Sequence, residues 1–452
     1  MIRIGIPYIV EDRGRAFLKA KVSISEDTAL RYMQLEQSLP KTHWRFYENY
    51  PPKEWKSEDF GLWIAVPKEY KDFLCVERAD AFVVAMLWYA IMTESDIEWD
   101  GEISEKLAFG IESLLLPALC KRGVTIRLKG KTSNIPVHTM NKVGTGMSCG
   151  VDSLYSMQKY TEKTVQESFR LTHLCYFNMG AIFHPNTEEN KRYGIEEFYT
   201  LTDQMSVEKC KNAVDVANLQ GLPLIYVESN LDKDFYRGAY GYTGVYRNCA
   251  MVLALQGLFS KYYCSSAGWP EFFDLSLTEG SEHYETMLCE AFSTESLRFI
   301  ISDYATRLEK TKALSDYEPA KEYLDVCFNF RSCGHCAKCY RTLITLDVLG
   351  QVDSFSKVFD VEQYKRERNK AFVWLLDTKD GDALDDNAVF AKDIYDLICQ
   401  SGFTIPEEAL RNYKELKRNR KNRNAIIKVK QLTKKVIGED GVKRIKVLVG
   451  RK

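Results

Sequence analysis

Residues 142–155 read KVGTGMSCGVDSLY, and this stretch decides the fold. The apolar run that ends at Met147 predicts a β-strand, and a helical pattern begins at about Ser153. Small residues stand between the two. They allow successive backbone N–H groups to converge on an anion, and the start of a helix adds the positive end of its dipole. The stretch therefore predicts a phosphate-binding turn between a strand and a helix.

The same rhythm of strand, turn and helix continues along the chain. Further strands are expected in 172–179, 224–229 and 261–268, with helices in 194–204 and 248–259. Alternating strands and helices predict an α/β fold in which helices cover both faces of a parallel sheet. Ligands of such sheets bind at the carboxyl ends of the strands. The loops after Met147, Phe177, Val227 and Ser265 are therefore the expected place of a functional site.

The 452-residue length exceeds what one hydrophobic core usually supports, so we expect several domains. Short β-rich runs and two apolar helical stretches, 79–92 and 105–119, predict an α+β N-terminal domain over 1–137. The parallel-sheet domain follows over 138–350. Residues 351–452 are expected to form a helical, basic C-terminal region, since 15 Lys or Arg face 3 Asp or Glu from Tyr413 onward.

Composition narrows the class of protein. The formal net charge is -1, so the chain as a whole has no electrostatic field that would attract nucleic acid. The basic tail could still bind nucleic acid, and the alternative for this tail is a helical surface exposed to solvent. The N-terminus lacks a signal-peptide pattern, and the longest apolar run, 79–92, is too short to span a bilayer. We expect a cytoplasmic protein without a membrane partner, whose 13 cysteines stay reduced.

Four cysteines crowd into residues 327–339 with the spacing C-x5-C-x2-C-x2-C. Gly334 would ease the tight turn between them. Four thiolates close a tetrahedral site without an open position, which is the pattern of a structural metal. Zinc is the expected ion, and an iron–sulfur cluster or a metal-free thiol cluster is the alternative. The expected ligands are Cys327, Cys333, Cys336 and Cys339.

The turn SCGVDS resembles the SGGxDS loop of the PP-loop ATP pyrophosphatases, a family of adenine-nucleotide α hydrolases. Cys149 stands where that family has its first glycine, and we expect its thiol to crowd the anion if this residue adopts a positive φ. The turn lacks the lysine of GxxxxGK[ST], which points away from kinases and GTPases. The resemblance implies that ATP and magnesium bind here and that Ser148, Gly150 and Ser153 hold pyrophosphate. The full set of expected cofactor-binding residues is Ser148, Cys149, Gly150, Val151, Asp152, Ser153, Asn178 and Gly180.

Together with the cysteine cluster, the turn resembles the 7-cyano-7-deazaguanine synthase family over about 138–350. Asn178-Met179-Gly180, Tyr246-Arg247-Asn248 and Lys310 extend the match. The resemblance implies that a deazaguanine-like carboxylate attacks the α phosphorus of ATP, and that an amine then displaces AMP to give an amide, a nitrile or a conjugate. Asp152 would organise magnesium or the loop, and Arg247 and Lys310 would stabilise phosphate charge.

The sequence also departs from the synthase pattern. The region after 268 does not reproduce the Asp-rich stretch of the synthases. Together with the extra flanking domains, this departure resembles the longer synthase-like proteins of bacterial antiviral defence systems. A protein acceptor or a defence-system partner is therefore expected beside the small-molecule carboxylate.

Three other interpretations stay open. The chain could be a tRNA-modifying sulfurtransferase that uses Cys175 and Cys264 as a sulfur pair. It could also be a non-catalytic nucleotide-binding component of a larger assembly. For Arg247 the alternative to phosphate contact is an ion pair near the start of a helix.

Overall fold

The structure is a computed structural model of the 452-residue chain. It describes all residues except 39–59, 181–194, 237–238, 267–272, 276, 278–279, 328–331, 382–384 and 423–452. The chain divides into two compact units, one of Met1–Cys333 with Asp353–Phe359 and one of Gly334–Val352 with Asp360–Lys452. The boundary expected near residue 137 lies inside the first unit, and the boundary expected near 350 lies close to where the chain passes between the units.

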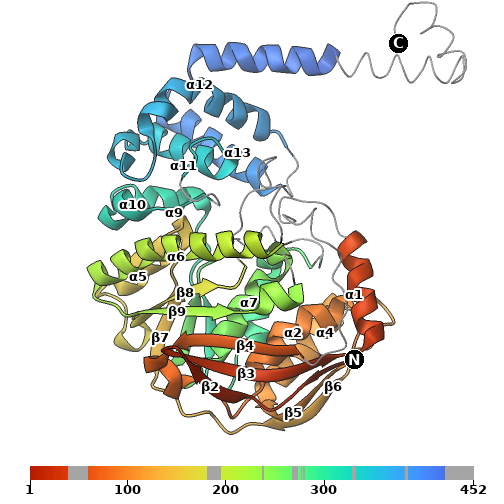
Figure 1. The fold of residues 1–452 in the computed structure, drawn as a ribbon. Helices are drawn as coiled ribbons and strands as arrows, with labels where there is room; N and C mark the ends of the chain where they lie inside the picture. The colour runs from red at the N-terminus through yellow and green to blue at the C-terminus, as the bar shows by residue number, and fades with distance from the viewer. Residues whose placement is uncertain are drawn as a thin grey trace, which may run out of the picture. The chain divides into compact units, whose positions relative to one another are not determined.

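The first unit is built on one mixed sheet of eleven strands (Figure 1). Its order is β11-β10-β7-β8-β9-β4-β3-β1-β5-β6, and β2 pairs with β3. The strands are β1 Ile2–Ile4, β2 Tyr8–Asp12, β3 Arg15–Ile24, β4 Phe60–Pro67, β5 Ile97–Ser104, β6 Leu128–Ser133, β7 Lys142–Gly146, β8 His173–Asn178, β9 Leu224–Ser229, β10 Phe259–Cys264 and β11 Arg298–Ile301.

Helices separate most of these strands in the first unit. The α-helices are α1 Glu26–Ser38, α2 Asp80–Met92, α3 Glu105–Gly110, α4 Leu116–Leu119, α5 Val151–Thr161, α6 Ile195–Gln220, α7 Tyr240–Leu253, α8 Glu285–Phe292, α9 Arg307–Leu314 and α10 Glu318–Tyr323. A π-helical turn, Ile111–Leu115, joins α3 to α4, and another, Leu231–Tyr236, follows β9. Short 3-10 helices occupy Lys68–Phe73, Glu167–Phe169 and Ser281–Tyr284.

The strands from β7 to β11 confirm the predicted α/β class. β7 pairs in parallel with β8 and β10, β8 with β9, and β10 with β11. The chain advances from β7 through β8 to β9 and then returns to the other side of β7 with β10. Because parallel crossovers are right-handed, this reversal puts α5 and α6 on one face and α7 on the other. The point between β7 and β10 is where such sheets bind ligands.

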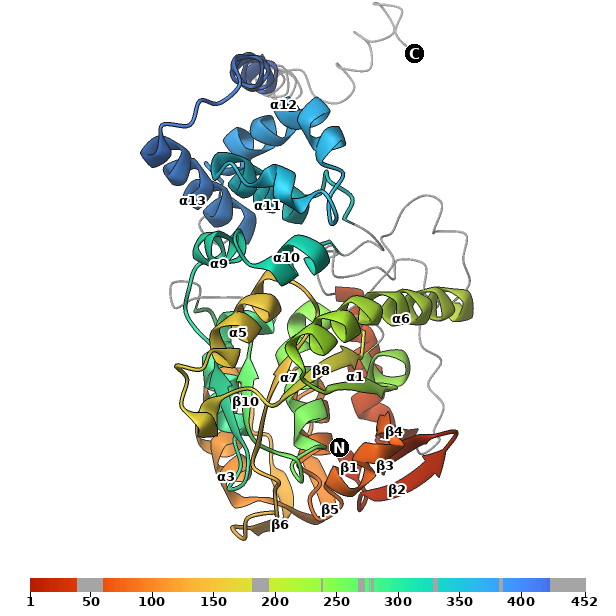
Figure 2. The ribbon, with the colours of Figure 1, turned by 90° about the vertical axis from the view of Figure 1, so that its left-hand side faces the viewer.

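The N-terminal strands extend this same sheet. β4 lies antiparallel to β9, with Ile64 opposite Ser229 and Ala65 opposite Glu228. β3, β1, β5 and β6 continue beyond β4 (Figure 2). The expected β-rich runs correspond to β1 to β4 and, in part, to β6. Sequence analysis did not predict β5, whose Asp100-Gly101 interrupts the apolar pattern.

Helix α2 is the centre of the core of the first unit. The apolar stretch 79–92 is helical as expected, and every residue from Asp80 to Ile91 is buried. The helix is apolar on all sides, so it must be covered on all sides. Asp80 is the exception, and it accepts hydrogen bonds from the Ser104 N–H and from Gln256 Nε2, both at 2.8 Å. Burial still raises the pKa of Asp80 to about 6.

The second unit is helical, as predicted. It contains α11 Ala337–Val348, α12 Val361–Thr378, α13 Asp386–Ser401 and a further helix over 407–422. Asp347 joins two of these helices, because it accepts hydrogen bonds from Arg368 at 2.6 and 2.9 Å and from the Tyr364 hydroxyl at 2.9 Å. Most of the basic tail lies outside the described residues. None of the described helices is long and apolar enough to cross a membrane.

Asn230 supports the short antiparallel joint between β4 and β9. Its Oδ1 accepts from the Trp63 N–H at 2.9 Å, and its Nδ2 donates to the Gly61 carbonyl at 2.8 Å and to Asp234 at 2.7 Å. The residue is 6% exposed, so water cannot readily replace these bonds. The joint therefore depends on one side chain as well as on its two residue pairs.

We expect Asn230→Ala to lower the free energy of unfolding by roughly 2 kcal/mol, because buried backbone groups lose their partners. Chemical denaturation measures this change. Asn218→Ala, on an exposed position of α6, is the matched control and should stay within about 0.5 kcal/mol of the wild type. Equal losses in the two variants would contradict the structural role of Asn230.

Candidate functional site

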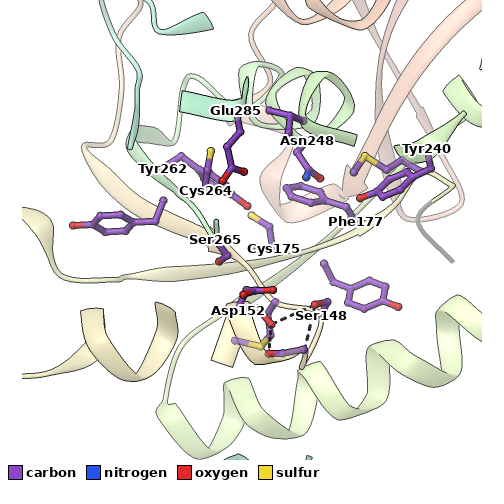
Figure 3. Close-up of a pocket in the computed structure, with 18 residues that line it drawn as sticks. Ser148, Asp152, Cys175, Phe177, Tyr240, Asn248, Tyr262, Cys264, Ser265 and Glu285 are labelled. Atoms are coloured by element: carbon purple, nitrogen blue, oxygen red, sulfur yellow. Dashed lines mark hydrogen bonds between the residues drawn. The ribbon is translucent and has the colours of Figure 1, made fainter. Parts of the chain in front are cut away.

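The turn between β7 and α5 is held together by its own side chains. The Ser148 hydroxyl accepts from the Gly150 N–H at 3.3 Å and lies 3.3 Å from the Ser153 hydroxyl. Ser153 in turn donates to the Gly150 carbonyl at 3.1 Å. Figure 3 shows this network beneath a pocket. The N-cap residue of α5 is Gly150, which has no side chain that could bind the first N–H groups of the helix. An anion can therefore bind there without competition from the cap residue.

Cys149 adopts the positive φ that sequence analysis considered, at 58°. Its side chain is fully buried, and it is not among the residues that line the pocket. Its carbonyl oxygen accepts the Asp325 N–H at 2.8 Å. Burial also raises the pKa of the Cys149 thiol well above its ordinary value. The thiol is thus packed into the protein, and the crowding expected from a positive φ does not occur in the pocket.

The pocket above the turn has a volume of about 250 Å³. Ser148 and Asp152 lie on one side of it, and Glu285 and Asn248 lie on the opposite side (Figure 3). Its wall comes from the carboxyl ends of β7, β8 and β10 and from α5, α7 and α8, as the sheet topology predicts. The lining residues are Gly146, Met147, Ser148, Gly150, Asp152, Ser153, Cys175, Tyr176, Phe177, Met179, Tyr240, Val245, Asn248, Tyr262, Tyr263, Cys264, Ser265 and Glu285.

Asp152 is the charged residue of the turn, and two cations hold it. Arg307 Nη2 lies 2.8 Å from one carboxylate oxygen, and Lys310 Nζ lies 3.1 Å from the other. Lys310 is 2% exposed, pairs also with Asp303 at 3.2 Å and donates to the Ser266 carbonyl at 2.6 Å. The structure therefore brings Asp152 and Lys310 together, although they are far apart in the sequence.

Arg307 was missed by sequence analysis, although a signal was present. The segment TRLE, residues 306–309, has the spacing of a capping box. In the structure the Thr306 hydroxyl accepts from the Glu309 N–H, and Glu309 accepts from the Thr306 N–H. This cap fixes the start of α9, which carries Arg307 and Lys310 towards Asp152.

Arg247 has a different place from the one the resemblance implies. It is fully buried, and it donates to Asp232, to the Met179 carbonyl and to Thr243, each at 2.7 Å. It does not line the pocket. The ion pair that sequence analysis kept as the alternative is therefore present, with Asp232 as the partner. Arg247 can act on the pocket only by positioning its neighbours.

Asn178 and Gly180 also stand beside the pocket without lining it, while Met179 between them does line it. Gly180 has a φ of 92°, and a Cβ atom there would lie 2.4 Å from Asp232 Cγ and 2.6 Å from Arg247 Nη1. A glycine is therefore required by the close approach of the ion pair. Asn248, which follows Arg247, reaches the pocket instead.

Glu285 is a pocket residue that sequence analysis did not single out. It begins α8, is 8% exposed and accepts a short hydrogen bond from the Ser266 hydroxyl. Burial raises the pKa of Glu285 to about 8, although Ser266 opposes the shift. Its carboxyl group is thus largely protonated at neutral pH and can donate a hydrogen bond to a molecule in the pocket.

The four cysteines of residues 327–339 do converge. Their sulfur atoms all lie within 4.8 Å of one another, so this group could hold a metal ion. Gly334 has a φ of 75°, as a tight turn between ligands requires. The Cys336 sulfur accepts the Cys339 N–H at 3.5 Å at the start of α11. None of the four cysteines is among the residues that line the pocket.

Comparison with known proteins adds no family. No protein-family model matches the chain, and neither curated proteins nor solved structures give a match.

The raised pKa of Glu285 predicts a pH dependence of stability. The folded protein keeps a proton that the unfolded chain releases near the ordinary value of 4.5. This contribution to stability is complete below pH 4.5 and is lost as the pH rises towards 8. Between pH 5 and 8 the wild type should lose up to about 1.4 kcal/mol per pH unit relative to Glu285→Gln.

Denaturant unfolding of both proteins across this pH range measures the difference. The other titratable groups contribute equally to the pH dependence of both proteins, so their contributions cancel in the difference. Glu290→Gln removes an exposed carboxylate from the same helix and should follow the wild type. Parallel profiles of the wild type and Glu285→Gln would refute a buried, protonated Glu285.

Proposed function

We propose that this protein is an ATP-dependent enzyme that forms AMP and pyrophosphate while it activates a carboxylate. The observation that supports this most strongly is the turn of residues 148–153. Its two hydroxyl groups and the start of α5 border a pocket at the carboxyl ends of β7 and β10. Oxygen-rich phosphates suit such a turn because backbone N–H groups and the helix dipole stabilise negative charge.

The sheet supports a PP-loop or adenine-nucleotide α-hydrolase domain. The order β9-β8-β7-β10-β11 is a doubly wound arrangement: β8 and β9 are added on one side of β7, and β10 and β11 are added on its other side. The turn follows β7. The architecture thus agrees with the resemblance of SCGVDS to the pyrophosphatase loop, and the N-terminal strands and helical second unit are additions to it.

The proposed chemistry has two steps. A carboxylate oxygen attacks the α phosphorus of ATP, and the bond from that phosphorus to the bridging oxygen breaks, which releases pyrophosphate. An amine nitrogen then attacks the acyl carbon, AMP leaves and the nitrogen loses a proton. Negative charge grows on the phosphate oxygens in the first step. Ser148, Ser153 and the N–H groups of the turn would stabilise it there.

Asp152 is the residue best placed to hold magnesium, whose preferred ligands are oxygen atoms. It lines the pocket at the turn, and its ion pairs with Arg307 and Lys310 fix its orientation. The bound ion would neutralise phosphate charge. Lys310 and Arg307 act through Asp152, and Arg247 positions Met179 at the pocket wall through the hydrogen bond to its carbonyl oxygen.

The proposed acid is a deazaguanine-like carboxylate, and the acceptor is ammonia or an amine of another molecule. Glu285 and Asn248 lie opposite the turn, where the acid would bind (Figure 3). A protonated Glu285 and an amide offer donors and acceptors suited to a planar heterocycle. A protein acceptor in antiviral defence rests on the resemblance of the longer chain alone, as does the cytoplasmic location.

Zinc is the proposed ion of the four-cysteine group. Four thiolates satisfy a tetrahedral ion completely, so the role would be structural. Three of its members, Cys327, Cys333 and Cys336, lie outside the described helices and strands, so the hydrogen bonds of a helix or sheet do not hold them. A bound ion would supply the missing stabilisation.

A sulfurtransferase remains the second candidate because Cys175 and Cys264 line the same pocket. Burial raises the pKa of Cys175 to about 12, so its thiol is protonated at neutral pH and is a poor nucleophile. Transfer of labelled sulfur from the protein to tRNA would support the sulfurtransferase over carboxylate activation.

The function is tested by pyrophosphate and AMP release from ATP and magnesium in the presence of a 7-carboxy-7-deazaguanine-type acid and ammonia. We expect release that depends on the acid, and a loss of at least about 100-fold in Asp152→Asn. Asp215→Asn, on an exposed position of α6, should retain the wild-type rate. ATP binding without AMP formation would instead favour the non-catalytic interpretation.

Cys333→Ser should lower the zinc content and the thermal midpoint together, because metal binding is coupled to folding. Elemental analysis and thermal unfolding measure the two quantities. Cys399→Ser, which changes an exposed thiol, should alter neither. Zinc content equal to that of the wild type would show that Cys333 is not a ligand.

A further inference from the structure

A second cysteine group lies in the first unit, apart from residues 327–339. Cys249 from α7, Cys264 from the end of β10 and Cys289 from α8 have sulfur atoms within 4.8 Å of one another. They are separated by 15 and 25 residues in the sequence, so only the fold brings them together. No spacing motif could reveal this group.

The group has one side in the core and one side at the pocket. Cys249 and Cys289 are 0% and 2% exposed. Cys264 is half-buried and lines the pocket, where Figure 3 shows it near Glu285. Among the described His, Cys, Asp and Glu side chains, no fourth ligand atom joins the three. A metal ion held here would therefore keep one coordination position open.

From this arrangement we infer a zinc site formed by Cys249, Cys264 and Cys289, whose fourth position faces the pocket. Zinc–sulfur bonds near 2.3 Å in a tetrahedron place the sulfur atoms about 3.8 Å apart, so the three thiols need to approach by at most about 1 Å. Three protein ligands with an exchangeable fourth are the pattern of a reactive zinc ion, in contrast to the closed four-cysteine group.

The ligand of the open position is a water molecule that a nitrogen or sulfur atom of the pocket's small molecule can replace. Zinc accepts both kinds of atom. Glu285 precedes Cys289 by one helical turn and lines the same pocket, so its carboxyl group is available to orient that ligand. The inference does not depend on ATP, because the three cysteines lie on α7, β10 and α8 and none of them belongs to the turn of residues 148–153.

The alternative is that these thiols pack as small apolar groups without a metal. Zinc content separates the two. The full chain is purified in a reducing buffer without chelators, and zinc per chain is measured by elemental mass spectrometry. Cys264→Ser should lose one zinc ion per chain relative to the wild type. Cys175→Ser, which changes a pocket thiol outside the group, should lose none.

Cobalt substitution gives a second measurement that needs no variant. In the cobalt-loaded wild type, imidazole should shift the visible d–d absorption bands, because it enters the open position of the three-cysteine site. A closed four-cysteine site gives no such shift. Wild-type zinc content in Cys264→Ser, or cobalt bands that ignore imidazole, would overturn the proposal. Circular dichroism of Cys264→Ser shows whether the variant is folded, so that a loss of zinc through misfolding is recognised. Cys289→Ser is a second variant that should lose the same zinc ion.

Discussion

The left-handed conformation of Cys149 is the constraint on which the candidate site depends. A non-glycine residue at a φ of 58° costs roughly 1–2 kcal/mol. Burial of the thiol and the hydrogen bond from the Asp325 N–H to its carbonyl oppose that cost. The reversal at this residue lets Ser148 and Gly150, on either side of it, border the pocket while the thiol stays inside the protein. A cysteine thus fits this turn, at the position where the pyrophosphatase loops that it resembles have glycine.

A second level of organisation surrounds this turn. Asp152 forms ion pairs with Arg307 and Lys310 of α9, and the Met179 carbonyl accepts a hydrogen bond from Arg247 of α7. Each of these interactions joins a pocket residue to a helix that is distant in the sequence. The pocket wall is therefore held by the ion pairs of the pocket residue Asp152 with Arg307 and Lys310, and by the ion pair of Arg247 with Asp232, which stays outside the pocket. Removal of one partner of the buried Arg247–Asp232 pair should be costly.

The sequence sufficed for the parts of the molecule that local pattern determines. The strand–turn–helix rhythm predicted the parallel sheet, and the turn was placed correctly because small residues interrupt two periodic runs. Contacts between distant segments could not be predicted. The pairing of β4 with β9, the partner of Arg247 and the protonated Glu285 depend on tertiary packing, which leaves no signal in spacing. The group around Cys264 is the extreme case, since its members lie on three elements.

We propose that the turn of residues 148–153 holds the phosphates that leave ATP. A crystal structure of the full chain with magnesium and an ATP analogue that carries a methylene bridge between the α and β phosphorus atoms tests it most directly. We expect β-phosphate oxygens within hydrogen-bond distance of the Ser148 and Ser153 hydroxyls and of the first N–H groups of α5. A triphosphate bound elsewhere, with this turn empty, would contradict it.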